Sequence, residues 1–393
     1  MSKIKAMTGN TTAAIAASLC RPDLIAAYPI TPQSSVAEYL SELVHDGILD
    51  ANLVTTESEH SVMSVIQGAA CAGARTFTAT SAQGLAFMYE PYFQMSTMRL
   101  PMVMALVTRE MISPCTVWSG QQDAMSVRDA GWIQVFVENN QEIMDMIIQG
   151  YMIAEHDDVL IPVNVCYDGF YLSHLVEGVE IPTQKEVDAF LPPVHFNHAV
   201  LDPDDPIAVD SLTSGEVLMR YRKTHLEAME KALDIIEEVD KKFSASFGRS
   251  YGGAIETYQC EDADIVLITV GGMTGTARDA VDIARANGIK VGLLKLRFVR
   301  PFPAKRIAKA LSDKKGFAVV DRSVCFGWST GPMYTEIRAA LTNENCDFSH
   351  FSAIGGLGGA DISLKHMLIV IEKLEKEKNQ PGQKDTLWLT KEL

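Results

Sequence analysis

Features that would identify a protein class at once are missing from this sequence of 393 residues. The first is clustered cysteine: no two of the seven have C-x-x-C spacing, and they are Cys20, Cys71, Cys115, Cys166, Cys260, Cys325 and Cys346. This odd, scattered set excludes a disulfide framework, and also a zinc site or a conventional iron–sulfur cluster built from this chain alone. We expect reduced thiols in a cytoplasmic protein without metal ligands of its own.

Positive charge and long apolar runs are also scarce. Lys and Arg number 34 against 50 Asp and Glu, so the formal net charge is −16. Nucleic acids and anionic membranes repel such a chain, and neither is an expected partner. The longest apolar runs, such as Leu100–Val107 and Ile265–Val270, are too short to span a bilayer. Residues 1–10 lack the apolar core of a signal peptide.

What the chain does have is an alternation of short apolar strands and helices. Strands are predicted at 24–28, 76–80, 102–108 and 160–166, and again at 265–270, 290–296, 317–320 and 351–354. Helices are predicted at 61–72, 141–154, 276–286 and 364–378. This alternation indicates the α/β class, with two domains that each contain a parallel sheet.

The alternation is interrupted between about residues 182 and 258. Proline-rich stretches at 191–193 and 202–206 are typical of irregular chain, and a charged helix is predicted at about 217–242. We interpret this part as a connection that wraps around the first unit and ends in a helix. The predicted domains are therefore residues 1–240 and 255–393.

A glycine-rich turn at 270–275 lies where a dinucleotide-binding loop would be. It reads Val-Gly-Gly-Met-Thr-Gly, whereas the G-x-G-x-x-G fingerprint requires glycine at position 270. The next strand ends in Lys295-Leu296-Arg297 rather than near an acidic residue for the ribose hydroxyls. We interpret the glycines as a tight strand–helix turn, which disfavours an NAD-dependent enzyme.

The segment Thr55–Ser61 permits two interpretations. Thr56 and Glu59 have the spacing of a capping box, in which Glu59 would accept a backbone N–H at a helix start. Alternatively, Glu59 is a buried carboxylate that bonds a heterocyclic nitrogen. These residues alone do not decide between the two.

Six motifs that occur in order along the chain provide further information. They are Gly9-Asn10, Tyr28–Ser35, Glu57–Ser61, Arg75–Leu85, Arg128–Gln134 and Leu296–Pro303. Over nearly its whole length the chain resembles the alpha subunits of the 2-oxoacid:ferredoxin oxidoreductase family, in particular those of pyruvate:ferredoxin oxidoreductases (pyruvate synthases).

The resemblance implies a fold and a reaction. The first domain would bind the aminopyrimidine half of thiamine diphosphate, and the smaller second domain would be similar to the C-terminal domain of transketolase. The implied reaction is the reversible, CoA-dependent oxidative decarboxylation of a 2-oxo acid. With pyruvate, the expected substrate, the products would be acetyl-CoA, carbon dioxide and reduced ferredoxin.

The resemblance also implies roles for individual residues. Glu59 matches the family's catalytic glutamate, which pairs with the pyrimidine ring, and Pro29 and Ile30 would contact the same cofactor. Arg109 and Thr31 match catalytic positions that face the substrate, where a guanidinium fork and a hydroxyl would bind its carboxylate. From the residues alone, Arg109 could instead be an exposed strand-end arginine and Thr31 a turn residue.

Two absences imply that the enzyme is divided among several chains. Thiamine enzymes hold magnesium and the diphosphate with a G-D-G segment and an asparagine pair, but this chain has no G-D-G, and cysteine clusters for [4Fe–4S] centres are missing too. By resemblance, a beta subunit binds the diphosphate, Mg and one cluster, and a small ferredoxin-like delta subunit carries others. A gamma subunit completes the hetero-oligomer, external ferredoxin accepts the electrons, and this chain alone would be inactive.

Two departures from the family pattern leave the substrate open. After Trp118, Ser119-Gly120 lacks the acidic residue that relatives usually carry, and Ala360 stands where relatives commonly have arginine. The same chemistry on a branched-chain 2-oxo acid, 2-oxoglutarate or oxalate is an alternative, although neutral Thr31 provides no second cation for a dicarboxylate. A non-catalytic scaffold subunit that retains the fold is a further alternative.

Overall fold

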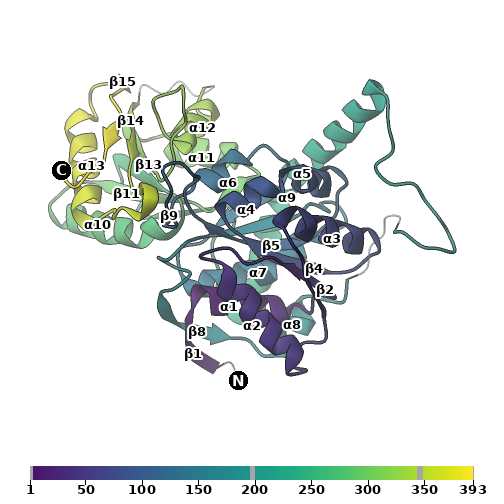
Figure 1. Cartoon of the computed structure of the whole chain (residues 1–393). Coiled ribbons are helices and arrows are strands. Elements are labelled where there is room, and N and C mark those ends of the chain that lie inside the picture. Colours follow the sequence, from purple (N-terminus) through teal and green to yellow (C-terminus); the bar gives the residue numbers. More distant parts are fainter. Residues whose placement is uncertain (1–2, 195–199, 343–347, 393) are drawn as a thin grey trace.

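The computed structural model describes residues 3–194, 200–342 and 348–392. These residues form two lobes, each built on a seven-stranded sheet, and a two-stranded sheet belongs to the first lobe. Figure 1 shows the N-terminal lobe in purple to teal and the C-terminal lobe in green to yellow. The α/β class predicted from the sequence is confirmed, because most neighbouring strands in both large sheets run parallel.

The N-terminal sheet has the strand order β12-β6-β7-β5-β4-β2-β3. Its parallel strands are β2 (Leu24–Ala27), β3 (Asn52–Thr55), β4 (Thr76–Thr80), β5 (Val103–Thr108), β6 (Ile133–Phe136) and β7 (Val163–Asp168). Successive side chains of a strand point to opposite faces, so that β5 contributes to two cores. Val103 and Ala105 belong to one core, and Met104 and Leu106 to the other.

Helices cover both faces of this sheet. One core includes residues of α1 (Gly9–Leu19), α2 (Ser34–His45), α7 (Asn140–Ala154), α8 (Gln184–Phe190) and α9 (Gly215–Phe247). The other core includes residues of α3 (Glu59–Cys71), α4 (Ala82–Phe87), α5 (Tyr89–Thr97) and α6 (Gln122–Ser126), and it continues into the core of the C-terminal lobe. The connection predicted as irregular therefore contains helix α8, and its long helix extends beyond 217–242 at both ends.

The C-terminal sheet has the order β15-β14-β13-β10-β11-β9, with β16 paired to β14. Its strands are β9 (Ile255–Tyr258), β10 (Ile265–Thr269), β11 (Val291–Leu296), β13 (Gly316–Asp321), β14 (Ser349–Ile354), β15 (Gly382–Gln383) and β16 (Leu387–Trp388). The helices of this lobe are α10 (Thr274–Ala286), α11 (Ala304–Leu311), α12 (Pro332–Ala340) and α13 (Leu364–Glu377).

The glycine-rich turn after β10 contacts the other lobe. It forms the short 3-10 turn η1 (Gly271–Met273), in which Gly271 has a φ of 76°. The backbone N–H of Gly272 donates to the carboxylate of Asp168 at 3.0 Å. The Asp168 carboxylate therefore accepts from a backbone N–H that a dinucleotide phosphate would need. This contact agrees with the interpretation of the glycine-rich segment as a tight strand–helix turn.

Besides β3, β6, β9, β15 and β16, three further strands were not predicted from the sequence pattern. Strand β12 (Phe298–Arg300) belongs to the C-terminal part of the chain but pairs with β6 in the N-terminal sheet. Strands β1 (Lys3–Thr8) and β8 (Val176–Ile181) pair antiparallel in the small sheet. Arg300 at the end of β12 contacts Asp129 at 2.9 Å, so two motifs that carry the family resemblance meet where the chain crosses between the lobes.

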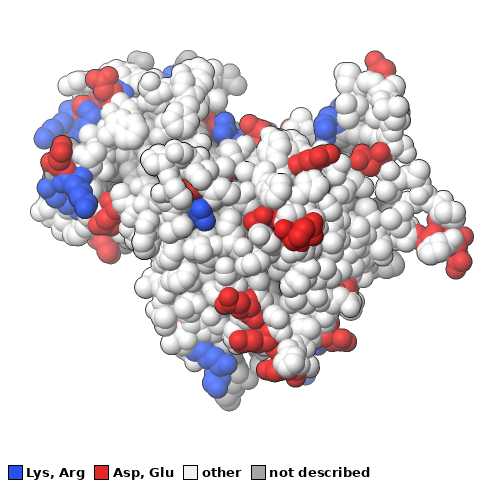
Figure 2. Space-filling view, in the orientation of Figure 1, with Lys and Arg blue, Asp and Glu red and all other residues white. Residues whose placement is uncertain are grey.

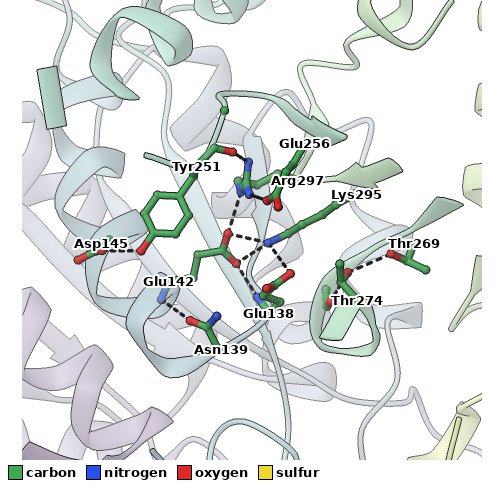
Figure 3. A network of polar contacts seen from close by, with 12 residues as sticks. Glu138, Asn139, Glu142, Asp145, Tyr251, Glu256, Thr269, Thr274, Lys295 and Arg297 are labelled. Carbon is green, nitrogen blue, oxygen red and sulfur yellow. Dashed lines mark hydrogen bonds and ion pairs between the residues drawn. The ribbon is translucent and has the colours of Figure 1, made fainter. Parts of the chain in front are cut away.

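A buried ion-pair network joins helix α7 of the first lobe to strand β11 of the second (Figure 3). The Glu142 carboxylate accepts hydrogen bonds from Lys295 Nζ at 2.6 and 2.7 Å and from Arg297 Nε at 2.8 Å. Burial alone would raise the pKa of Glu142, but the two cations hold it at about 2. Arg297 also contacts Glu256 at 2.6 Å, and Lys295 contacts Glu138 at 3.0 Å. The basic residues near the end of β11 therefore hold the lobes together.

The substitution Glu142→Gln should destabilise the protein, because it leaves two buried cations without their shared partner. We expect a loss of about 3–5 kcal/mol in the free energy of unfolding at pH 7, measured by urea denaturation. The control Glu230→Gln, on the exposed surface of α9, should change it by less than about 0.5 kcal/mol.

The effect should depend on pH in a defined direction. The folded-state pKa of Glu142 is about 2, below the unfolded value of about 4.3. The stabilisation is therefore fully present above the unfolded pKa and is lost as the pH falls through the folded pKa. A difference between variant and wild type that is as large at pH 3 as at pH 7 would contradict this account.

Candidate active site

The carboxyl ends of parallel strands meet at one edge of the N-terminal sheet, and the predicted site residues follow these ends. Tyr28–Thr31 follows β2, Glu59 comes shortly after β3, Ser81–Gly84 follows β4, and Arg109 directly follows β5. In open α/β sheets this edge is the usual place for ligands. The fold thus gathers residues from motifs that are far apart in the sequence.

Glu59 is the first residue of helix α3, and only 6% of its surface is exposed. The helix is capped by Ser58, whose hydroxyl accepts from the Ser61 N–H at 3.3 Å, while the Thr56 hydroxyl donates to the Ser58 carbonyl at 2.9 Å. The capping-box interpretation of Thr56 and Glu59 is therefore wrong. Burial raises the pKa of Glu59, and no cation of the described chain forms an ion pair with it.

Gly84 lets the Glu59 carboxyl group lie against the turn that follows β4. A Cβ atom at position 84 would lie 2.7 Å from Glu59 Oε1 and 2.5 Å from Thr80 Oγ1. Both distances are too short for a carbon atom, so any other residue would displace the carboxyl group or the hydroxyl. The close approach of the Glu59 carboxyl group and the Thr80 hydroxyl therefore explains why the Ser-Ala-Gln-Gly motif ends in glycine.

Arg109 is buried, with 7% of its surface exposed, so the alternative of an exposed strand-end arginine is wrong. Its Nη1 donates to the Thr31 carbonyl, its Nη2 donates to Gln83 Oε1 at 2.6 Å, and its backbone N–H donates to Asp123 at 3.0 Å. Burial lowers the pKa of Arg109. The guanidinium is thus fixed by neighbours that leave its Nε without a partner.

Asn10 anchors the turn that contains Pro29, Ile30 and Thr31. Asn10 donates from Nδ2 to the Pro32 carbonyl at 2.7 Å and to the hydroxyl of Ser35 at 2.8 Å. Pro29 and Thr31 are exposed, and Ile30 is half-buried. Thr31 contacts Arg109 through its backbone carbonyl oxygen. The predicted role of the Thr31 hydroxyl therefore stays a prediction.

Three further residues belong to this site and were not predicted. Gln83 orients Arg109, and Gln33 is 1% exposed. The fully buried carboxylate of Asp123 accepts from the N–H groups of Ala82 and Arg109, both at 3.0 Å, so it links the turns after β4 and β5. Burial raises the pKa of Asp123 to about 7 despite these donors. Gln33 and Gln83 lie within the family motifs, which was the available sequence signal.

Several buried polar atoms of Arg109 and of the segments at the ends of β2 and β4 have no hydrogen-bond partner within the described chain. They are Gln33 Oε1 and Nε2, Thr80 Oγ1, Ser81 Oγ, Gln83 Nε2 and Arg109 Nε. Buried polar groups are normally paired, so this set fits a polar ligand that supplies both donors and acceptors. The carboxyl group of Glu59 fits a heterocyclic nitrogen, and the donors of Arg109 and Gln83 fit a carboxylate. The residues therefore fit an aminopyrimidine and a 2-oxo acid.

Both departures from the family pattern lie at one contact between the lobes. The Ser119 hydroxyl donates to Asp168 at 3.1 Å and accepts from Arg322 at 2.9 Å, while Gly359 donates its N–H to the Ser119 carbonyl at 2.7 Å. A Cβ at Gly120 would lie 2.1 Å from Glu110 Oε1, so any other residue there would displace the Glu110 side chain. The segment after Trp118 therefore packs against the glycine loop that precedes Ala360.

A cleft of about 350 Å³ lies between the lobes. Its lining residues include Asp168, Arg322 and Asp361, but not Glu59 or Arg109. Within the described part of the chain, no group of three or more His, Cys, Asp or Glu could hold a metal ion, and no helix is long and apolar enough to cross a membrane. Six cysteines are free, and the seventh, Cys346, lies outside the described residues.

Two family models of pyruvate:ferredoxin oxidoreductases match this chain, one in each lobe. The family model described as pyruvate flavodoxin/ferredoxin oxidoreductase, thiamine diphosphate-binding, matches residues 15–241. The model described as pyruvate:ferredoxin oxidoreductase core domain II matches residues 263–367.

Two curated relatives align over nearly the whole chain. The alpha subunit of the NADH-dependent phenylglyoxylate dehydrogenase of Aromatoleum evansii is 48% identical over 380 residues, which is 95% of this chain and 91% of that protein. The pyruvate synthase subunit PorA of Methanocaldococcus jannaschii is 44% identical over 391 residues, which is 99% of this chain and 98% of that protein.

A solved structure shares the fold. The 2-oxoglutarate:ferredoxin oxidoreductase of Magnetococcus marinus, with 2-oxoglutarate, coenzyme A and succinyl-CoA bound, matches with a TM-score of 0.74 at 20% sequence identity. The match covers 95% of this chain and 65% of that chain.

Removing the charge of Glu59 should stabilise the protein without cofactor at high pH. Because the folded-state pKa of Glu59 is raised, its contribution to stability is present below the unfolded pKa of about 4.3 and is lost as the pH rises through the folded pKa. We expect Glu59→Gln to raise the thermal unfolding temperature at pH 8 by about 2 °C, with a smaller gain at pH 5.

The neighbouring carboxyl group provides the control. Glu57 is exposed, and a hydrogen bond from the Ser61 hydroxyl lowers its pKa, so Glu57→Gln should bring no gain in stability. Calorimetry of both variants at the two pH values checks the prediction. A Glu59→Gln variant that unfolds at a lower temperature than wild type at pH 8 would contradict it.

Proposed function

The chain belongs to the pyruvate flavodoxin/ferredoxin oxidoreductase family, and from this premise we propose that it is the alpha subunit of a multi-subunit 2-oxoacid:ferredoxin oxidoreductase acting on pyruvate. The reaction is pyruvate, CoA and oxidised ferredoxin giving acetyl-CoA, carbon dioxide and reduced ferredoxin. The observation that carries the proposal is one segment after β4 that meets both groups: Gly84 lies against the buried carboxyl group of Glu59, and Gln83 fixes the guanidinium of Arg109. Polar atoms of this segment have no partner within the described chain.

Glu59 is proposed to hold a proton at the ring nitrogen of the aminopyrimidine. When bound, thiamine diphosphate supplies a nucleophilic carbon and takes up the electrons released by decarboxylation. The raised pKa of Glu59 supports this role, since a carboxyl group that stays protonated can donate a hydrogen bond to a basic ring nitrogen. Gly84 leaves the space that the carboxyl group needs, and Pro29 and Ile30 are proposed to contact the same ring.

Arg109 is proposed to bind the carboxylate of the substrate. Its remaining N–H groups, the free Nε2 of Gln83 and the hydroxyl of Thr31 would donate hydrogen bonds to the two carboxylate oxygens. Among the site residues named above, Arg109 is the one with a positive charge. This single cation supports a monocarboxylate such as pyruvate rather than 2-oxoglutarate.

The proposed division of the chain follows the two lobes. Residues 1–240 would form the pyrimidine-binding domain with its wrapping segment, and residues 255–393 the transketolase C-terminal-like domain. Two family models that end at 241 and begin at 263 support this division.

The missing parts of the enzyme are proposed to reside in partner chains. No G-D-G segment and no cysteine cluster occur in the sequence, so a beta subunit would supply the diphosphate site, Mg and one [4Fe–4S] cluster. Gamma and ferredoxin-like delta subunits would complete the complex, and external ferredoxin would accept the electrons. The scattered cysteines support a cytoplasmic location.

A second candidate substrate is an aromatic 2-oxo acid such as phenylglyoxylate. The 48% identity to the alpha subunit of phenylglyoxylate dehydrogenase favours it. So does an aromatic pair near Arg109. The ring centres of Trp118 and Phe170 are 4.4 Å apart, and the Trp118 carbonyl accepts from the N–H of Glu110, which directly follows Arg109.

The substitution Glu59→Ala in the assembled complex should reduce turnover by about 10²–10⁴-fold, because it removes the group that holds the proton at the ring nitrogen. Reduction of ferredoxin or viologen with pyruvate and CoA measures this effect. The control Glu57→Ala, two residues away and exposed, should retain wild-type turnover. Unchanged turnover of Glu59→Ala would instead support the non-catalytic scaffold alternative.

The substrate should be identified by a panel of pyruvate, 2-oxoisovalerate, 2-oxoglutarate, oxalate and phenylglyoxylate. We expect the highest kcat/KM with pyruvate. Arg109→Lys should raise the KM for pyruvate at least about tenfold, because lysine keeps the charge but loses the bidentate fork. Faster turnover with phenylglyoxylate would replace pyruvate by the second candidate, and an unchanged KM in Arg109→Lys would remove Arg109 from the substrate site.

A further inference from the structure

Asp123 of helix α6 lies in an unusual place for an acidic side chain. Figure 2 shows Asp and Glu on the surface of both lobes, where solvent screens their charges. Asp123 has no exposed surface, and no cation of the described chain forms an ion pair with it. A buried carboxylate without a cation is costly unless hydrogen bonds satisfy its oxygen atoms. The hydrogen-bond donors around Asp123 must therefore offset this cost.

These donors are three backbone N–H groups from three segments of the chain. Oδ1 of Asp123 accepts from the N–H of Ala124 in the same helix at 2.8 Å. Oδ2 accepts from the N–H groups of Ala82 and Arg109, both at 3.0 Å. Ala82 comes shortly after β4, and Arg109 directly follows the neighbouring strand β5. A single oxygen atom therefore ties together the segments that leave two adjacent strands.

Ala82 depends on this anchor because its backbone has a rare conformation. It is a fully buried residue with a φ of 36°, and it begins helix α4. The side chain of the preceding residue, Ser81, does not cap this helix, so the carboxylate of Asp123 satisfies the first N–H instead. Residues other than glycine persist in the left-handed region only where surrounding contacts hold them. The bond from Asp123 therefore fixes the turn that leads from β4 into α4.

The turn that Asp123 fixes carries the two residues that meet the site. Gln83 Oε1 accepts from Arg109 Nη2 at 2.6 Å. Gly84 lies against Glu59, because a Cβ at position 84 would be 2.7 Å from Glu59 Oε1. Asp123 thus acts on Arg109 twice, through the N–H of Arg109 and through Gln83. It acts on Glu59 through Gly84.

We propose that Asp123 is a positioning residue that holds the substrate-binding Arg109 and the cofactor-binding Glu59 in one fixed arrangement. Asp123 acts through these two residues and not by contact with the 2-oxo acid or the aminopyrimidine. Such an arrangement matters for the rate, since a misplacement of about 1 Å can lower it about 10²-fold. The inference rests on the function proposed above, which gives Arg109 and Glu59 their ligands.

The substitution Asp123→Asn in the assembled complex tests this role. Asparagine has the same shape, but its NH₂ group has to face at least one of the three backbone N–H groups. We expect kcat/KM for the most active 2-oxo acid of the panel above to fall about tenfold. Because Glu59 is displaced as well, the affinity for thiamine diphosphate should fall at least about threefold. Titration calorimetry on the complex freed of cofactor measures this affinity independently of turnover.

The matched control is Asp240→Asn. Asp240 of α9 is 5% exposed, and its carboxylate also accepts three hydrogen bonds. The donors are the N–H of Tyr251 at 2.8 Å, the N–H of Gly252 at 3.1 Å and the hydroxyl of Ser250 at 2.7 Å. These residues lie outside the candidate site. The control should therefore lower the thermal unfolding temperature as Asp123→Asn does, but leave kcat/KM and the affinity for thiamine diphosphate unchanged.

A double-mutant cycle shows whether Asp123 acts through the arginine. Two substitutions that act on one interaction have effects that do not add as free energies. In the Arg109→Lys background, Asp123→Asn should lower kcat/KM by less than about threefold, compared with about tenfold in the wild-type background. Asp240→Asn should have no effect in either background.

The inference alone is overturned if Asp123→Asn keeps the wild-type kcat/KM and affinity while Glu59→Ala loses turnover. It is also overturned if Asp240→Asn lowers kcat/KM as much as Asp123→Asn does, or if Asp123→Asn has its full effect in the Arg109→Lys background. Retained turnover in Glu59→Ala overturns the proposed function and this inference with it.

Discussion

A buried carboxyl group that forms no ion pair with any described residue is the constraint on which the candidate site depends. Glu59 begins helix α3, where the helix N-terminus favours a negative charge, yet burial dominates and raises its pKa. Burying such a carboxyl group costs folding free energy. The chain nevertheless keeps the space that the Glu59 carboxyl group occupies, because Gly84 stands where any side chain would displace that group. Under the proposed function, a ligand with a basic nitrogen enters this site.

Contacts with the second lobe support the segments that carry this site. Glu142 binds Lys295 and Arg297 in the buried network, and the pair between Asp168 and Arg322, at 2.5 Å, fixes the segment that follows β7. The same pair holds Ser119, whose carbonyl receives the N–H of the C-terminal glycine loop. The unusual residues at 119–120 and 360 therefore lie at the packing contact between the lobes.

Periodicity and propensity predicted the class, half of the described strands, and the helices α3, α7, α9, α10 and α13. Strand β4 has the predicted bounds, and helix α7 begins one residue early. The pattern failed for β12, which has three residues and joins a sheet formed by a distant part of the chain. The capping box failed because Ser58 competes for the same helix end. The bonds from Arg109 to Thr31 and Gln83 span 78 and 26 residues, so local sequence contains no trace of them. The family resemblance suggested that Arg109 and Thr31 lie together, but it did not suggest the contact with Gln83.

The account depends on the claim that Glu59 of this chain contacts the aminopyrimidine while another chain holds the diphosphate. The most direct measurement is an experimental structure of the complete complex with thiamine diphosphate bound. The account predicts a Glu59 oxygen at about 2.6–3.2 Å from the ring nitrogen and the diphosphate on residues of a different subunit. A cofactor bound entirely by one chain, or a ring nitrogen that contacts a residue other than Glu59, would contradict it.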